Sequence, residues 1–151
     1  MKLQKILIIL IFVLSFGYNS FAQDANCKDF AKSGLAVLDT SIYVHDGHYN
    51  TVTLSEGDKI DIYKPFYRGR KYKIVAMAES ELPGLDITIK NVRRQELYKS
   101  DETLDKQQWE YVPTKTENLI ISVEIPKLTV EEGVKLKRAC VAILIGFSAS
   151  K

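Results

Sequence analysis

Histidine, cysteine and tryptophan are scarce in this sequence of 151 residues, which contains two, two and one of them. The shortage of histidine and cysteine works against metal chemistry, because a structural zinc site needs four ligands and a catalytic one usually three. The sequence also lacks a GxSxG nucleophile elbow and a glycine-rich phosphate loop. We therefore expect a protein that is not an enzyme.

A strong excess of one charge sign is also absent. The chain has 21 basic and 19 acidic residues, and Lys2 and Lys5 are the only charged residues among the first 22. The remainder thus carries 19 residues of each sign and is neutral. Because a basic surplus is the electrostatic mark of nucleic-acid binding, we expect no nucleic-acid partner.

The first 22 residues have the pattern of a secretory signal peptide. Two lysines precede an apolar run from Ile6 to Phe16, and small residues up to Ala22 suit cleavage there. The run is shorter than the roughly 20 residues of a membrane-spanning helix, and a retained anchor is the alternative. We predict a signal peptide over 1–22, a single domain over 23–151 without a membrane span, and a periplasmic or extracellular location.

The two cysteines, Cys27 and Cys140, both follow the predicted cleavage site. An even number of cysteines in an oxidising compartment is most simply a disulfide. We predict that they are bridged, and two buried free thiols are the alternative.

Most of the chain from Ile42 onward alternates apolar and polar residues between turn signals. This period of two is typical of β-strands and predicts an all-β domain, a two-layer β-sandwich of jelly-roll type. The last strand, over 139–147, is apolar on both faces and should lie in the middle of a sheet. Strands are expected near 41–44, 49–54, 59–63, 71–78, 85–90, 109–111, 119–125 and 139–147.

The segment from Asn26 to Leu38 departs from this pattern. Phe30, Ala31, Gly34 and Leu38 would form one weak apolar face of a helix, with Asn26 as its N-cap. Glycine weakens a helix, so we predict a short helical or irregular segment.

Four segments combine strand and turn features in a recognisable order, together with Trp109 and Tyr111. They are LSEGDKIDIYKPFYRGRKYKIVAMAE at 54–79, LDITIKN at 85–91, NLIISVEIP at 118–126 and CVAILIGF at 140–147. This order resembles small secreted β-sandwich proteins of Gram-negative bacteria and, more distantly, pre-peptidase C-terminal (PPC-like) domains. The resemblance covers most of 43–147 and implies a non-catalytic accessory or binding module.

The stretch YKPFYRGRKYKIV at 63–75 is rich in bases and aromatic rings. If 59–75 forms a hairpin, its outer face carries Lys59, Asp61, Tyr63, Lys71, Lys73 and Met77, and pairing with Asp61 explains part of the basic run. The hairpin tip holds Phe66, Tyr67, Arg68 and Arg70, residue types that often anchor interfaces. We predict that this tip contacts an envelope protein or glycan. Alternatively, Phe66 and Tyr67 fold back to cover the end of the sandwich.

The sequence HDGH at 45–48 is a second candidate. An Asp-Gly pair favours a two-residue hairpin, which would make His45 and His48 opposed neighbours beside Asp46. Such a pair could ligate zinc or titrate near neutral pH, and a plain exposed turn is the alternative.

Two further candidates concern ligands. Asp101, Glu102 and Asp105 form the densest acidic cluster, where calcium could bind, although a solvated loop explains it equally well. Trp109 and Tyr111 could stack on sugars, although we expect Trp109 to belong to the core. The predicted function is a secreted non-catalytic binding module, with a carbohydrate-binding module or a small metal-dependent hydrolase using HDGH as alternatives.

Overall fold

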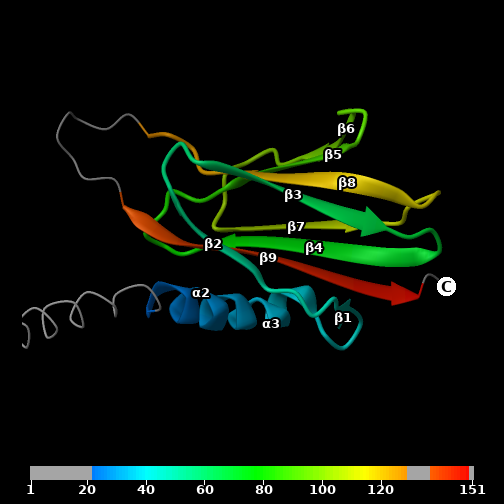
Figure 1. Ribbon diagram of the computed structural model, residues 1–151, viewed down its shortest axis with the longest axis horizontal. Helices are drawn as coiled ribbons and strands as arrows, with labels where there is room; N and C mark the ends of the chain where they lie inside the picture. The colour runs from blue at the N-terminus through cyan, green and yellow to red at the C-terminus, as the bar shows by residue number, and fades with distance from the viewer. Residues whose placement is uncertain (1–21, 129–136, 150–151) are drawn as a thin grey trace, which may run out of the picture.

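The protein is a two-layer antiparallel β-sandwich, as predicted, and two short helices cover one of its faces (Figure 1). The structure is a computed structural model that describes residues 22–128 and 137–149. One sheet has the order β1/β2-β9-β4-β7 and the other β3-β8-β5-β6. The elements are α2 (Ala22–Ser33), α3 (Leu35–Leu38), β1 (Val44–His45), β2 (Asn50–Ser55), β3 (Lys59–Phe66), β4 (Arg70–Ala78), β5 (Asp86–Asn91), β6 (Glu96–Lys99), β7 (Lys106–Tyr111), β8 (Glu117–Glu124) and β9 (Arg138–Ala149).

The strands pair from the ends of the chain inward. Strand β2 pairs with β9, β3 with β8, β4 with β7 and β5 with β6, all antiparallel. This is the pairing of a long hairpin that has been wrapped into two sheets, which is the jelly-roll arrangement. The predicted fold class is therefore confirmed, including its jelly-roll type.

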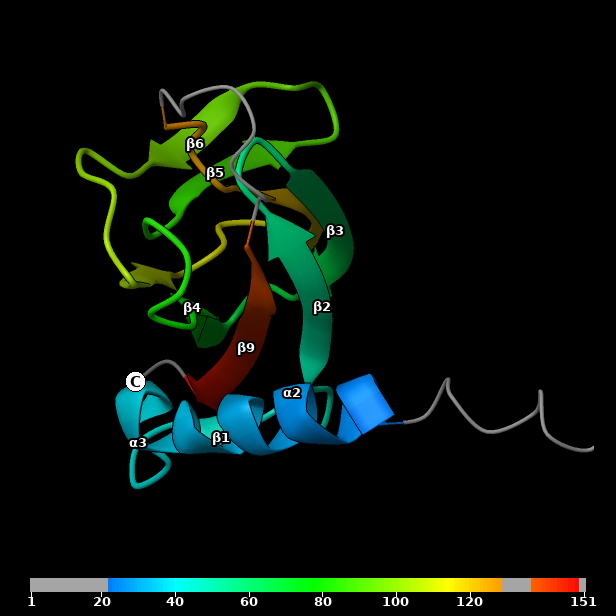
Figure 2. The ribbon, with the colours of Figure 1, turned by 90° about the vertical axis from the view of Figure 1, so that its left-hand side faces the viewer.

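Strand β9 lies between β2 and β4 and is buried on both faces, as predicted. Its inner face packs between the sheets, and its outer face packs under the helices, which lie across that sheet (Figure 2). The helix-covered cluster also includes two residues of β4, Val75 and Met77. The inner residues of β9 are Ala139, Val141, Ile143 and Ile145, and the outer ones Ala142 and Leu144.

The predicted helical face at Ala31 and Leu38 is confirmed, because both are fully buried. The N-cap prediction was wrong, since α2 begins at Ala22 and Asn26 lies inside it. Gly34 separates α2 from α3, and a Cβ atom there would lie 2.6 Å from Cδ1 of Leu144. The absence of a side chain at Gly34 thus lets the helices approach the sheet closely. Short helices are stabilised mainly by such packing, so the sheet fixes their position.

The predicted disulfide is present and joins Cys27 of α2 to Cys140 of β9 across 113 residues of sequence. A bond of this kind indicates an oxidising compartment outside the cytoplasm. Residues 1–21 of the predicted signal peptide and residues 129–136, between the predicted strands at 119–125 and 139–147, lie outside the described residues. Within the described ranges, no helix is long and apolar enough to cross a membrane.

The predicted hairpin over 59–75 was wrong. Strand β3 pairs with β8 in one sheet, and β4 pairs with β7 and β9 in the other. The chain therefore crosses between the sheets at 67–69, because a sandwich of this pairing places neighbouring strands on opposite layers. Met77 faces the helices and is fully buried, so it does not share an outer face with the lysines.

The charges of this stretch also have other partners than predicted. Asp61 accepts a hydrogen bond from the Ser122 hydroxyl at 2.6 Å. Lys59 pairs with Glu124 at 3.6 Å, across the ladder of β3 and β8. Lys71 of β4 pairs with Glu110 of β7 at 2.6 Å. These ion pairs form because β3 lies beside β8, and β4 beside β7.

Removal of the disulfide should weaken the fold strongly. Replacing Cys27 and Cys140 together by serine should lower the free energy of unfolding by about 4 kcal/mol, because the bridge closes a loop of more than a hundred residues. Urea unfolding of the variant and of the parent protein, with and without reductant, measures the change. If the two proteins have equal midpoints, packing of the helices alone fixes them on β9 and the bridge is dispensable.

Candidate functional site

Strands β1 and β2 form one interrupted edge strand along β9. Val44 lies opposite Phe147 and His45 opposite Gly146, and the ladder resumes with Asn50 opposite Ile143. Residues 46–49 have no ladder partner and form a four-residue excursion, although its first residue, Asp46, still donates its backbone N–H to the Ile145 carbonyl oxygen at 2.9 Å. The predicted two-residue hairpin was wrong, since the Asp-Gly pair turns the chain but the chain returns to the same partner strand. His45 and His48 are consequently not opposed neighbours.

Asp46 organises the excursion. Its Oδ1 accepts a hydrogen bond from the His48 backbone N–H at 2.9 Å and lies 3.8 Å from both His45 Nε2 and His48 Nδ1. The His45 ring packs against Tyr49, with 4.7 Å between ring centroids, while the His48 side chain is 70% exposed. The interaction between Asp46 and His48 is a local turn that needs no metal.

The metal predictions are not decided by this geometry. Among the described residues, no three His, Cys, Asp or Glu side chains come together as a group that could hold a metal ion. Asp101, Glu102 and Asp105 are exposed in the connection between β6 and β7. Zinc at His45, Asp46 and His48 and calcium at the acidic cluster stay predictions.

The predicted tip at 66–70 divides into a buried and an exposed part. Phe66 is fully buried against Tyr72, with ring centroids 4.6 Å apart, so it is not part of an exposed contact surface. Tyr67 is 50% exposed, and Arg68 and Arg70 are also exposed. Only the first half of the alternative prediction holds, because Phe66 covers the core and Tyr67 does not.

Hydrogen bonds hold the backbone of the tip in place. The Tyr67 N–H donates to the Tyr72 hydroxyl at 2.9 Å, and the Arg68 N–H donates to Thr116 Oγ1 at 3.3 Å. Gly69 has a φ of +82°, a left-handed conformation that glycine adopts without strain. The exposed side chains of the tip are therefore presented from an ordered turn.

Arg70 lies across two aromatic rings. Its guanidinium carbon is 4.7 Å from the centroid of Phe147 and 5.7 Å from that of Tyr67. In residues 22–128 and 137–149, neither Arg70 nor Arg68 forms an ion pair with an acidic residue. Arginine over aromatic faces keeps its charge and its donors available.

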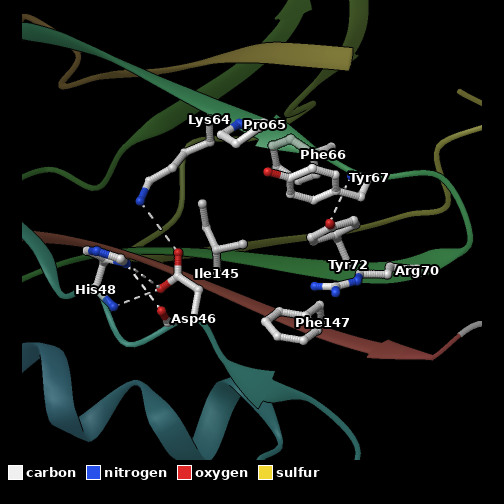
Figure 3. Close-up of a pocket in the computed structure, with 10 residues that line it drawn as sticks. All are labelled: Asp46, His48, Lys64, Pro65, Phe66, Tyr67, Arg70, Tyr72, Ile145 and Phe147. Carbon is white, nitrogen blue, oxygen red and sulfur yellow. Dashed lines mark hydrogen bonds and ion pairs between the residues drawn. The ribbon is translucent and has the colours of Figure 1, made fainter. Parts of the chain in front are cut away.

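A pocket of about 270 Å³ brings the two sequence candidates together (Figure 3). Asp46 and His48 come from the excursion between β1 and β2, and Tyr67 and Arg70 come from the tip. No local sequence pattern indicates that these segments meet, because β1 and β3 belong to different sheets. The remaining lining residues are Lys64, Pro65, Phe66, Tyr72, Ile145 and Phe147.

Lys64 is a site residue that sequence reasoning missed. It follows Ile60 and Ile62 on the inward-facing side of β3, and its ammonium group reaches across to Asp46 Oδ2 at 3.5 Å (Figure 3). Both side chains are about one-fifth exposed. The sequence did contain a signal for it, since Lys64 is a charged residue at an alternating position of β3 that is otherwise apolar. An inward-facing charge of this kind also protects an edge strand from pairing with another chain.

A second hollow of about 270 Å³ lies along the same open edge of the sandwich. Ile60 and Ile62 of β3 line it, with Val52 of β2 and Ile143 of β9. Lys64 follows these residues along β3 and lines the first pocket instead. The space between the edge strands β2 and β3 is therefore apolar at one end and carries charged groups at the other.

Trp109 and Tyr111 lie on the inner face of β7 and pack against the main core, as expected for Trp109. Their rings stack at 4.8 Å, and Trp109 also stacks on Tyr98 at 5.5 Å. Phe66 lies 6.4 Å from Tyr111, so the row of rings continues to the pocket. Sugar binding by these rings stays a prediction.

The Tyr111 hydroxyl is partly buried and donates a hydrogen bond to Glu117 at 2.7 Å. Burial, and then this hydrogen bond, raise the pKa of Tyr111 to about 12.

The tip residues should differ sharply in their effect on stability. Phe66→Ala removes a fully buried ring and should lower the free energy of unfolding by about 3–5 kcal/mol. Tyr67→Ala removes a half-exposed ring and should change it by only about 0.5 kcal/mol. Chemical denaturation measures both, and a loss of similar size for Tyr67→Ala would identify Tyr67 as a packing residue.

Stability should fall at high pH because of Tyr111. An unfolded tyrosine releases its proton near the ordinary pKa of 10.0, whereas folded Tyr111 keeps it until about pH 12. Its contribution is therefore complete below pH 10 and is lost as the pH rises toward 12. The loss stays below the roughly 2.7 kcal/mol that two pKa units represent, because solvent screens a partly exposed group. Denaturation at pH 9, 10 and 11 should show a smaller decline in Tyr111→Phe. Parallel curves for the two proteins would contradict the assignment.

No family model matches the sequence, and no curated protein matches it. Among solved structures, the chain is similar to Aeromonas hydrophila PliG, a periplasmic lysozyme inhibitor of g-type lysozyme, with 9% identity and a TM-score of 0.50. That alignment covers 67% of this chain and 85% of PliG. The VP2 subviral particle of infectious bursal disease virus aligns over 71% of this chain and 32% of its own, with 11% identity and a TM-score of 0.44. At 9% identity, the likeness to PliG shows a shared fold, and the resemblance to PPC-like domains stays a prediction.

Proposed function

We propose that this protein is a secreted, non-catalytic β-sandwich that binds another protein of the cell envelope. The contact surface is the end of the sandwich where Tyr67, Arg68 and Arg70 surround the pocket. The single observation that supports this choice is the exposure of an aromatic ring and two arginines on an ordered turn. Preordered side chains lose little conformational entropy when a partner binds, and tyrosine and arginine are the types that most often anchor interfaces.

Two further observations support a role outside the cytoplasm and with a protein partner. The disulfide between Cys27 and Cys140 agrees with the predicted secretion. The fold is shared with PliG, which is described as a periplasmic inhibitor of another protein. Because a fold hosts many functions, this likeness suggests only which purified partner to assay first, namely g-type lysozyme.

Changes at the tip should weaken partner binding without unfolding the protein. We expect Tyr67→Ala combined with Arg68→Ala to lower the affinity for the partner at least tenfold, since central Tyr and Arg contacts often contribute more than 1.4 kcal/mol. The measurement is affinity capture by the mature protein from an envelope extract of the producing organism, followed by titration of the captured protein. Lytic activity of g-type lysozyme is assayed in parallel.

A matched control keeps this test specific. Tyr63→Ala combined with Arg93→Ala removes the same residue types from exposed positions that do not line the pocket. The control should capture the partner as the parent protein does. If both double variants bind equally well, or neither the extract nor lysozyme yields a partner, the proposed function is wrong.

A further inference from the structure

The pocket beside Arg70 combines an apolar interior with a charged rim. Its walls are formed by the rings of Phe66, Tyr67, Tyr72 and Phe147, and Ile145 lies between Asp46 and Tyr72 (Figure 3). A volume of about 270 Å³ lies just below the range of roughly 300–1,000 Å³ that is usual for small-molecule sites. The pocket is therefore of a size for one side chain of a partner and its immediate surroundings.

The charges at the rim are not balanced. Asp46 is the acidic residue that lines the pocket, and it is already engaged by Lys64 at 3.5 Å and by the His48 backbone N–H at 2.9 Å. In the part of the chain that the structure describes, Arg70 pairs with no acidic side chain. Its guanidinium group is held by Phe147 and Tyr67 at the mouth of the pocket. The rim thus has an uncompensated positive charge next to an apolar hollow.

We propose that this pocket binds a segment of a partner protein in which a carboxylate lies beside an apolar, preferably aromatic, side chain. The apolar group fills the hollow between Tyr67, Tyr72 and Phe147, and the carboxylate pairs with the guanidinium fork of Arg70. Arginine is suited to this role because its planar donors match the two oxygens of a carboxylate. The inference rests on the proposed function and names the chemistry of the partner's contact.

The backbone around the pocket supports selection between ligands. The Tyr67 N–H is fixed on the Tyr72 hydroxyl, and the Tyr72 ring is fixed against Phe66. Arg70 therefore keeps its place relative to the rings without a ligand. A ligand that has the ring but lacks the charge fills the hollow and leaves Arg70 unpaired, so the preference for a carboxylate is measurable.

The test uses N-acetyl-L-phenylalanine and its amide as probes, which differ in the carboxylate alone. Each is titrated into the mature protein and followed by chemical-shift changes in its NMR spectrum. The acid should bind with a Kd of about 1 mM, the order expected for a ligand of this size, and at least five times more tightly than the amide. The largest shifts should occur at Tyr67, Arg70 and Phe147.

Variants identify the group that recognises the carboxylate. Arg70→Gln should abolish the preference for the acid, Arg70→Lys should keep part of it, and Arg93→Gln, at an exposed site outside the pocket, should keep all of it. The unfolding midpoint of each variant shows whether the loss of the contact with Phe147 has disturbed the fold. Raising the ionic strength should lower the affinity of the protein for the acid and leave its affinity for the amide unchanged, because salt screens the ion pair.

Three outcomes would overturn the inference. They are equal binding of the acid and the amide, shifts that lie elsewhere, and an unchanged preference in a folded Arg70→Gln variant. If the acid shows no preferred binding but a partner is still captured through the tip, only the carboxylate chemistry is rejected and the proposed function stands. Binding of the acid without tip-dependent capture indicates a free small carboxylate as the ligand and rejects the partner segment.

Discussion

Strand β9 is buried on both faces, and the positions of the second sheet and of the helices follow from this burial. A strand with apolar residues on each side needs a layer above and below it. The second sheet supplies one layer, and α2 with α3 supplies the other. The disulfide from Cys27 to Cys140 fixes the helix on this strand, and Gly34 permits the close approach. The helices are thus part of the core, although the fold is a β-sandwich.

The candidate site arises where this regular arrangement ends. The edge strand beside β9 is interrupted at 46–49, and the neighbouring edge strand β3 carries Lys64 at an inward position. The Lys64–Asp46 pair connects the two layers at a place where apolar packing is incomplete. A row of rings from Trp109 through Tyr111, Phe66 and Tyr72 forms the wall behind it. The pocket is thus an opening between sheets whose far side is well packed.

Parts of the fold and of the site could be predicted from local pattern. Alternation located most strands, and the doubly apolar run identified β9 as central. Strand β6 was missed because it is only four residues long, with three of them exposed and two charged, which is typical of an edge. The hairpin over 59–75 was mispredicted because a turn signal is the same whether the chain stays in one sheet or crosses to the other. Tyr67, Arg68 and Arg70 were correctly placed at a surface turn, while Phe66 was not.

Local sequence patterns were enough to predict the all-β class, the pairing of the cysteines, the central place of β9 and the residue types at the 67–70 turn. These features follow from composition and from the period of two, which act over a few residues at a time. The contacts of the site follow from the fold of the whole chain: Asp46 and His48 meet Tyr67 and Arg70, Lys64 pairs with Asp46, and Phe66 is buried. Those contacts depend on which strands share a sheet, and strand pairing is a property of the whole chain.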